Sequence, residues 1–158
     1  MRPGTKQFAP SFPNVSAQKV CRTVVLSEGK PVVPFSPDSP VVLVVEDEVI
    51  IRMAAANELR SHGFDVMEAD NAKEAIILLK TQVPIALLFT DVRLPGSMNG
   101  LALARLVHEE HPDMKIVVTT ANPAMPDDGH GVDAFFRKPY RLDRVVASIE
   151  SLLANGRD

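Results

Sequence analysis

Five polar residues stand at the ends of short apolar runs, and together they could perform one chemical task. They are Glu46, Asp47, Asp91, Thr120 and Lys138. Neighbouring carboxylates repel one another, and a hard divalent cation relieves this repulsion. Mg2+ binds few protein carboxylates and takes phosphate oxygens as further ligands. An ammonium group and a hydroxyl can hold the remaining phosphoryl oxygens. The set therefore predicts a Mg2+ site at which Asp91 acts as a carboxylate nucleophile and forms an aspartyl-phosphate.

Each of these residues also has a plainer structural interpretation. An acid directly after a strand, such as Asp47, often caps the next helix. The Thr120 hydroxyl could bond only to backbone, and Lys138 could be a solvated surface charge. Asp91, shortly before Pro95, is typical of a turn. The chemical interpretation therefore depends on whether the fold brings these strand ends together.

The apolar runs alternate with segments of helical spacing from residue 41 onward. Strands are predicted at 41–45, 64–69, 84–90, 114–119 and 132–137. Helices are predicted at 48–62, 71–82, 101–111 and 141–153. Gly63 is placed to end the first helix, and Asn71, with Glu74 three residues later, is placed to begin the second.

Strands and helices that alternate over short connections are typical of a parallel sheet with helices on both faces. Right-handed crossovers leave few topologies for such a sheet. Functional groups in these α/β folds gather at the carboxyl ends of the strands. If the first, third, fourth and fifth strands are neighbours, the five polar residues converge on one patch.

Residues 1–40 differ in composition from the rest of the chain. They hold seven of the thirteen prolines and carry five basic against two acidic side chains, whereas residues 41–158 carry twelve basic and eighteen acidic ones. So many prolines favour an extended arm over packed helices. We expect an extended or partly disordered arm at 1–40, with a small hairpin at 20–35 as the alternative, and a folded domain at 41–155.

Composition also bears on partners and on the compartment. The formal net charge of −3 gives no basic field for nucleic acid. No apolar run approaches the roughly 18 residues of a membrane span. Cys21 is the single cysteine, which excludes an internal disulfide and suits a reducing compartment. We expect a cytoplasmic monomer or weak dimer that contacts neither DNA nor membrane.

Four sequence segments surround the polar residues. They read VLVVEDEVIIRM, LLFTDVRLPGSMNG, IVVTTAN and FFRKPY. In combination they resemble the receiver domain of bacterial two-component response regulators, the CheY-like family, over residues 41–155. This resemblance implies a flavodoxin-like, doubly wound five-stranded sheet of order 2-1-3-4-5. It also implies a cis peptide bond between Lys138 and Pro139.

The resemblance further implies roles for the acidic residues. Asp91 resembles the phosphoacceptor, and Glu46 and Asp47 resemble the acidic pair that holds Mg2+. The backbone carbonyl of Arg93 would complete the protein ligands of the metal.

Three other residues would then respond to phosphorylation. Lys138 resembles the lysine that binds the phosphoryl group, Thr120 the switch hydroxyl and Phe135 the switch aromatic. A histidine kinase or histidine phosphotransferase would donate the phosphoryl group, and a shift between two states would change a contact with a downstream protein. Beyond phosphorylating and dephosphorylating itself, the domain is expected to have no enzymatic activity.

Two of the departures from the family pattern bear on the metal site and on the output surface. Glu46 stands where Asp is commoner. The stretch 121–131 contains Pro123, Pro126 and Gly129, so the helix expected there is short or irregular. Because that region normally carries the output of a receiver, the identity of the output partner does not follow from the resemblance.

Two alternatives use the same polar residues. A phosphate sink in a phosphorelay would share the chemistry without switching a partner. A phosphatase of the haloacid-dehalogenase type also uses an aspartate, Mg2+, Thr and Lys, but it requires a second aspartate where this chain has Arg93. Few residues follow position 153, and we therefore expect output through protein contact and not through a further domain.

Overall fold

The computed structural model describes residues 35–36, 38–122, 124 and 131–155. The predicted arm at 1–40 and its alternative hairpin lie almost wholly outside the described residues, as does most of the stretch 121–131. Phe35 packs against the domain core, and the Ser36 amide donates a hydrogen bond to the Asp65 carboxylate at 2.7 Å. Among the described residues, no helix is long and apolar enough to cross a membrane.

In the part of the chain that the structure describes, five parallel strands form one sheet of order β2-β1-β3-β4-β5, which confirms the predicted topology. The strands are β1 (Val41–Val45), β2 (Asp65–Ala69), β3 (Ile85–Asp91), β4 (Lys115–Thr120) and β5 (Ala134–Arg137). Every residue of β1 is buried, as expected of a central strand whose β-branched side chains are covered on both faces.

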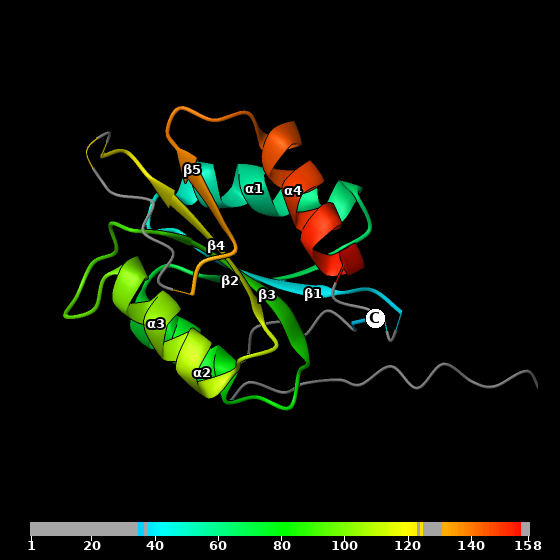
Figure 1. Cartoon of the computed structure of the whole chain (residues 1–158), viewed down its shortest axis with the longest axis horizontal. Helices are drawn as coiled ribbons and strands as arrows, with labels where there is room; N and C mark the ends of the chain where they lie inside the picture. Colours follow the sequence, from blue (N-terminus) through cyan, green and yellow to red (C-terminus); the bar gives the residue numbers. More distant parts are fainter. Residues whose placement is uncertain (1–34, 37, 123, 125–130, 156–158) are drawn as a thin grey trace, which may run out of the picture.

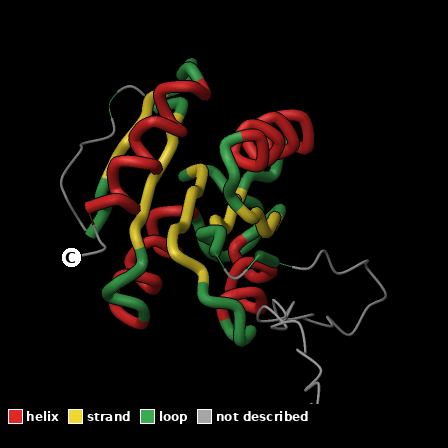
Figure 2. Tube along the Cα trace, turned by 90° about the vertical axis from the view of Figure 1, so that its right-hand side faces the viewer, coloured by secondary structure: helices red, strands yellow, loops and turns green. Residues whose placement is uncertain are grey.

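Within the described residues, four helices cover the two faces of the sheet. They are α1 (Val49–Ser61), α2 (Ala72–Leu79), α3 (Gly100–Glu110) and α4 (Leu142–Asn155). In Figure 1, α1 and α4 lie on one side of the strands and α2 and α3 on the other, and Figure 2 shows this layering from the side. Successive side chains of β1 point to opposite faces of the sheet. Leu43 packs in the core beneath α2 and α3, whereas Val42 and Val44 pack in the core beneath α1 and α4.

Local sequence signals set the helix ends close to where they were predicted. Gly63 adopts a φ of +86° directly after the first helix, a conformation that costs glycine little. The Asn71 side chain accepts a hydrogen bond from the Glu74 amide at 2.8 Å and begins α2. This helix ends at Leu79, earlier than the predicted position 82, because the Thr81 hydroxyl and amide both bond to the Leu78 carbonyl.

The start of α3 packs directly on the end of β3. The Gly100 amide donates to the Val92 carbonyl at 2.8 Å and closes the loop that follows Asp91. A Cβ at position 100 would lie 1.8 Å from the Asp91 carbonyl oxygen, so glycine is required by this close approach. The contact fixes α3 against the strand end that carries Asp91.

Candidate functional site

The strand order places four polar strand ends side by side. Glu46 follows β1, Asp91 ends β3, Thr120 ends β4 and Lys138 follows β5, and these four strands are consecutive in the sheet. Backbone hydrogen bonds extend the ladders to these residues: the Glu46 amide donates to the Ala69 carbonyl at 3.1 Å and the Lys138 amide to the Thr120 carbonyl at 2.7 Å. The convergence predicted from the sequence is therefore present.

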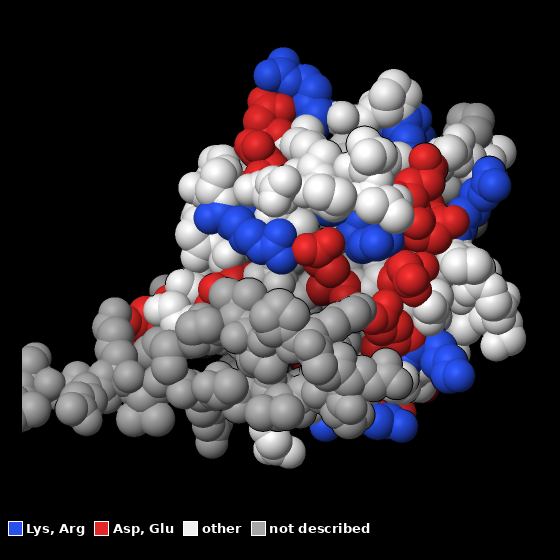
Figure 3. All heavy atoms as spheres, turned by 180° about the vertical axis from the view of Figure 1, so that it is seen from behind, with Lys and Arg blue, Asp and Glu red and all other residues white. Residues whose placement is uncertain are grey.

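Glu46, Asp47 and Asp91 form a cluster of carboxylates. Each offers one oxygen, and these oxygens all lie within 4.8 Å of one another. Glu46 is 2% exposed and Asp91 is 6% exposed, whereas Asp47 is exposed. Figure 3 shows acidic side chains gathered down the right of the rear face, the side on which the strands end. Two sheltered carboxylates and one open to solvent fit a hard divalent cation that keeps part of its water shell.

Lys138 lies between the two buried carboxylates. Its Nζ donates to Glu46 Oε2 at 2.9 Å and lies 3.2 Å from Asp91 Oδ2. Burial raises the pKa of Glu46 above its usual value, and the hydrogen bond and charge of Lys138 offset part of that rise. Burial would lower the pKa of Lys138, but Glu46 and Asp91 outweigh it, and the pKa of Lys138 is raised. The lysine thus carries its charge within the acidic cluster.

The second carboxylate oxygen of Asp91 has no hydrogen-bond partner among the described residues. This Oδ1 atom is buried, whereas Oδ2 faces Lys138. A buried, unpaired carboxylate oxygen is costly unless a cation or a reacting group satisfies it. Asp91 therefore combines one anchored oxygen with one oxygen whose lone pairs are available for a metal ion or an electrophile.

The three remaining predicted residues differ in how deeply they are buried. Thr120 is buried, and its Oγ1 accepts a hydrogen bond from the Asn122 amide at 3.1 Å. Phe135 is half-buried against the core beneath α2 and α3, with the Arg137 guanidinium 5.9 Å from its ring centroid. Arg93 lies two residues after Asp91, with its side chain exposed. The predicted metal contact of the Arg93 carbonyl stays a prediction.

Residues 42–150 match the family described as the response regulator receiver domain. The chain belongs to this family. Of the described elements, the match includes every strand and helix apart from the first residue of β1 and the end of α4. The Lys138–Pro139 peptide bond of this receiver domain is cis, as the resemblance implied. The family match leaves the haloacid-dehalogenase alternative without support.

Known receivers resemble this chain in sequence and in structure. It is 29% identical over 119 residues to the DNA-binding transcriptional regulator NtrC of Salmonella typhimurium, covering 73% of this chain and 25% of that protein. A response regulator receiver protein from Sinorhizobium medicae superposes with a TM-score of 0.71 at 27% identity, covering 77% of this chain and 100% of that one. The response regulator TrrA of Thermotoga maritima, in complex with Mg(2+)-BeF, gives a TM-score of 0.64 at 27% identity, covering 72% and 98%.

The chain spans from a quarter to about half of the length of the curated relatives it matches. The activities of those longer proteins are therefore not assigned to this chain.

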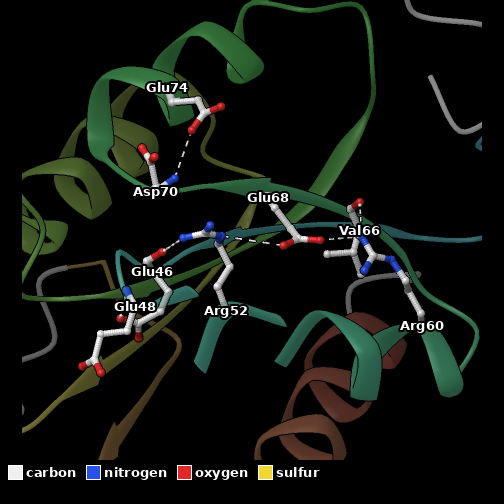
Figure 4. A network of polar contacts seen from close by, with 8 residues as sticks. All are labelled: Glu46, Glu48, Arg52, Arg60, Val66, Glu68, Asp70 and Glu74. Carbon is white, nitrogen blue, oxygen red and sulfur yellow. Dashed lines mark hydrogen bonds and ion pairs between the residues drawn. The ribbon is translucent and has the colours of Figure 1, made fainter. Parts of the chain in front are cut away.

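An arginine that the sequence did not single out supports the site of this receiver. Arg52 on α1 donates from Nη1 to the Glu46 carbonyl at 2.6 Å, and its Nε lies 3.7 Å from the Glu68 carboxylate on β2 (Figure 4). Arg60 contacts the other oxygen of Glu68 at 2.7 Å. The Glu46 backbone is therefore tied to α1 as well as to β2. The motif VLVVEDEVIIRM contained this arginine, but only its helical placement beside the strand end reveals the role.

The role of a half-buried tyrosine was likewise not apparent from the sequence. The Tyr140 ring packs edge-on against Phe89 and Phe136, with centroids 6.4 Å apart in both pairs. Burial chiefly raises the pKa of its hydroxyl. Because it follows Lys138 and Pro139 directly, this packing anchors the turn that carries the lysine.

Proposed function

We propose that this chain accepts a phosphoryl group on Asp91 from a histidine kinase or histidine phosphotransferase, with Mg2+ as cofactor. The observation that carries the proposal is the pair of Asp91 oxygens: Oδ2 beside Lys138 and Oδ1 buried without a partner among the described residues. A nucleophilic carboxylate needs such an available oxygen, and a transferred phosphoryl group needs cations beside it.

Glu46, Asp47, Asp91 and the Arg93 carbonyl would hold Mg2+, which when bound supplies charge neutralisation for the phosphoryl oxygens. Among these groups, the three carboxylates already lie close enough to share one ion. The TrrA structure, which contains Mg(2+)-BeF, supports this assignment by similarity.

The transfer itself exchanges one bond to phosphorus for another. A carboxylate oxygen of Asp91 forms the new O–P bond as the P–N bond to the donor imidazole breaks, and the released imidazole nitrogen keeps that electron pair and takes up a proton from water. The Lys138 ammonium, already beside Asp91, neutralises developing charge on the phosphoryl oxygens. Attack of water on the aspartyl-phosphate would release phosphate and restore the carboxylate. Apart from these reactions on itself, we propose no enzymatic activity.

Thr120 and Phe135 are the proposed conformational readout. The Thr120 hydroxyl, which accepts a hydrogen bond from the Asn122 amide, would donate to a phosphoryl oxygen. Phe135 is only half-buried, so its ring has room to turn toward the space that the threonine leaves. The resulting shift between two states would change the affinity for a downstream protein. The relatives include a DNA-binding regulator, so the expected absence of DNA contact stays a prediction.

An apolar surface beside the site suits the phosphodonor. Val49, Ile50 and Met53 of α1 are 53%, 78% and 50% exposed. A groove of about 560 Å3 runs from Ile50 to Lys138 and Leu142, between α1 and the start of α4. A donor bound there would lie next to Lys138, close to the oxygen that it must reach.

Phosphoramidate tests the chemistry, because its P–N bond is of the kind that phosphohistidine carries. With Mg2+, intact mass spectrometry should show one added phosphoryl group, and chelation of Mg2+ should abolish it. Asp91→Asn should remain unmodified, whereas Asp70→Asn, an exposed acid outside the cluster, should react like the parent chain. A modified Asp91→Asn protein would overturn the proposal.

The donor surface requires a separate experiment. Ile50→Glu should leave phosphoramidate labelling unchanged but slow phosphoryl transfer from a histidine kinase, because only the protein donor needs the apolar surface. Equal loss with both donors would contradict this division of roles.

A further inference from the structure

A second groove lies on the opposite face of the sheet from the proposed donor surface. It has a volume of about 650 Å3 and runs between α2 and the loop that joins β3 to α3. Its lining includes Lys73, Ile76, Ile77 and Lys80 from the α2 side and residues 95–98 from the loop. In Figure 1, α2 and α3 both lie on the side of the strands away from α1 and α4. The proposed function uses none of these residues.

The groove presents apolar surface to solvent. Ile77 is 54% exposed, while Ile76 and Met98 are half-buried and pack against the core beneath them. A single exposed isoleucine is unremarkable on a protein surface. Here, however, it lies in a concavity next to two other apolar side chains, which is the arrangement that accepts apolar side chains of another molecule.

Two lysines flank this apolar surface. Lys73 and Lys80 are both exposed and, at a spacing of seven residues, project on the same side of α2 as the intervening Ile76 and Ile77. Neither lysine forms an ion pair with any residue that the structure describes. Residues 41–158 carry an excess of six acidic side chains. Two ammonium groups that border one groove, with no ion-pair partner among the described residues, therefore run against the net charge of the domain.

We propose that this groove binds an acidic, amphipathic segment of a partner protein. Apolar side chains of that segment would pack on Ile77 and Met98, and its carboxylates would lie against Lys73 and Lys80. Complementary charge of this kind speeds association and rejects basic competitors. Apolar anchors alternating with polar positions are how amphipathic segments fill grooves of other proteins.

The charge of the groove also selects against residues 1–34 of the same chain as its occupant. Residues 1–34 carry five basic side chains and one acidic one. A basic segment would meet Lys73 and Lys80 with like charge, which disfavours binding. The acidic partner is therefore the better match.

The experiment is a selection from a random peptide display library on the full chain, followed by affinity measurement of the selected peptides by fluorescence anisotropy. We expect selected peptides to combine Asp or Glu with Leu, Ile, Phe or Met. Lys73→Glu with Lys80→Glu, and separately Ile77→Glu, should weaken their binding about tenfold or more. Lys73→Gln with Lys80→Gln and Ile77→Ala provide milder versions if a glutamate variant fails to fold by circular dichroism.

A matched control lies on the other face of the sheet. Arg144→Glu makes the same kind of charge change on α4 and should leave peptide binding unchanged. Binding should persist in Asp91→Asn, so the result stands apart from the phosphorylation proposal.

Three outcomes would overturn the proposal. The first is selection of peptides without acidic enrichment, or of peptides indifferent to the α2 variants. The second is binding that appears only after removal of residues 1–34, which would make the arm the occupant. The third is self-association, seen by analytical ultracentrifugation, that the α2 variants abolish, because that would make a second copy the occupant.

Discussion

The Asp91 carbonyl oxygen lies so close to Gly100 that a Cβ at position 100 would be 1.8 Å from it. Gly100 also donates its amide hydrogen to the Val92 carbonyl at 2.8 Å. The proposed phosphoacceptor is thus clamped between its own strand and the first residue of α3.

Gly100→Ala should therefore destabilise the protein, although alanine normally stabilises a helical position. We expect the free energy of unfolding in urea to fall by about 2 kcal/mol, as for overpacked sites. Gly96→Ala is the control, because its Cβ meets no neighbour within 4 Å and only its φ of +96° opposes the change. The expected loss there is about 1 kcal/mol. A larger loss at position 96 than at position 100 would contradict the clamp.

Lys138→Met should lower the unfolding free energy of the metal-free protein by about 3 kcal/mol, because it leaves two buried carboxylates without their shared cation. Adding Mg2+ should recover part of that loss, since a divalent cation replaces the ammonium charge between them. Thermal unfolding with and without Mg2+ measures both effects. If Mg2+ stabilises Lys138→Met no more than it stabilises the parent chain, the lysine and the metal do not neutralise the same carboxylates.

The raised pKa of Glu46 predicts a pH dependence of stability. The folded state binds a proton at Glu46 more tightly than the unfolded state does, so this group's contribution falls as pH rises from the usual value of 4.5 through the raised pKa. Glu46→Gln removes the titration. In chelator, its unfolding free energy should decline less over that pH window than that of the parent chain. Parallel pH profiles for the two proteins would refute the assignment.

Arg52→Gln should weaken Mg2+ binding about tenfold, as loss of a residue that orients a metal ligand generally does. The reason is the hydrogen bond from Arg52 Nη1 to the Glu46 carbonyl at 2.6 Å. Arg60→Gln is a close control, because it removes the 2.7 Å contact with the same Glu68 carboxylate yet has no hydrogen bond to Glu46. Isothermal titration calorimetry of both variants should separate them. An equal loss of Mg2+ affinity in both variants would mean that the ion pairs with Glu68, and not the hydrogen bond to Glu46, cause the effect.

The strands and most helix limits followed from the sequence because their signals are local. A continuous β-branched run marked β1, and the caps at Asn71 and Gly63 act within a few residues of themselves. The end of α2 was predicted three residues too late because Lys80 and Gln82 are good helix formers, whereas the Thr81 hydroxyl bonds to the Leu78 carbonyl and closes the helix. Helix propensity alone does not predict such a hydrogen bond from a side chain to the backbone.

The sequence predicted which residues belong to the candidate site but not which of them bond to one another. The sequence indicated Lys138 as a cation for the phosphoryl group, and the structure shows it already bonded to Glu46. Nothing in the sequence singled out Arg52, because its partner is a backbone carbonyl whose direction only the fold sets.

By itself, the sequence determined which residues could do chemistry and at which strand ends they stand, because residue type and short-range periodicity are properties of the chain. The tertiary structure decided which of those groups touch. Glu46 and Lys138 are 92 residues apart and meet through the order of the sheet and the packing of Tyr140 beside the turn. The apolar groove bordered by Lys73 and Lys80 likewise exists only because the loop closed by Gly100 lies next to α2. Contacts of this kind depend on the simultaneous packing of distant segments, which no local pattern encodes.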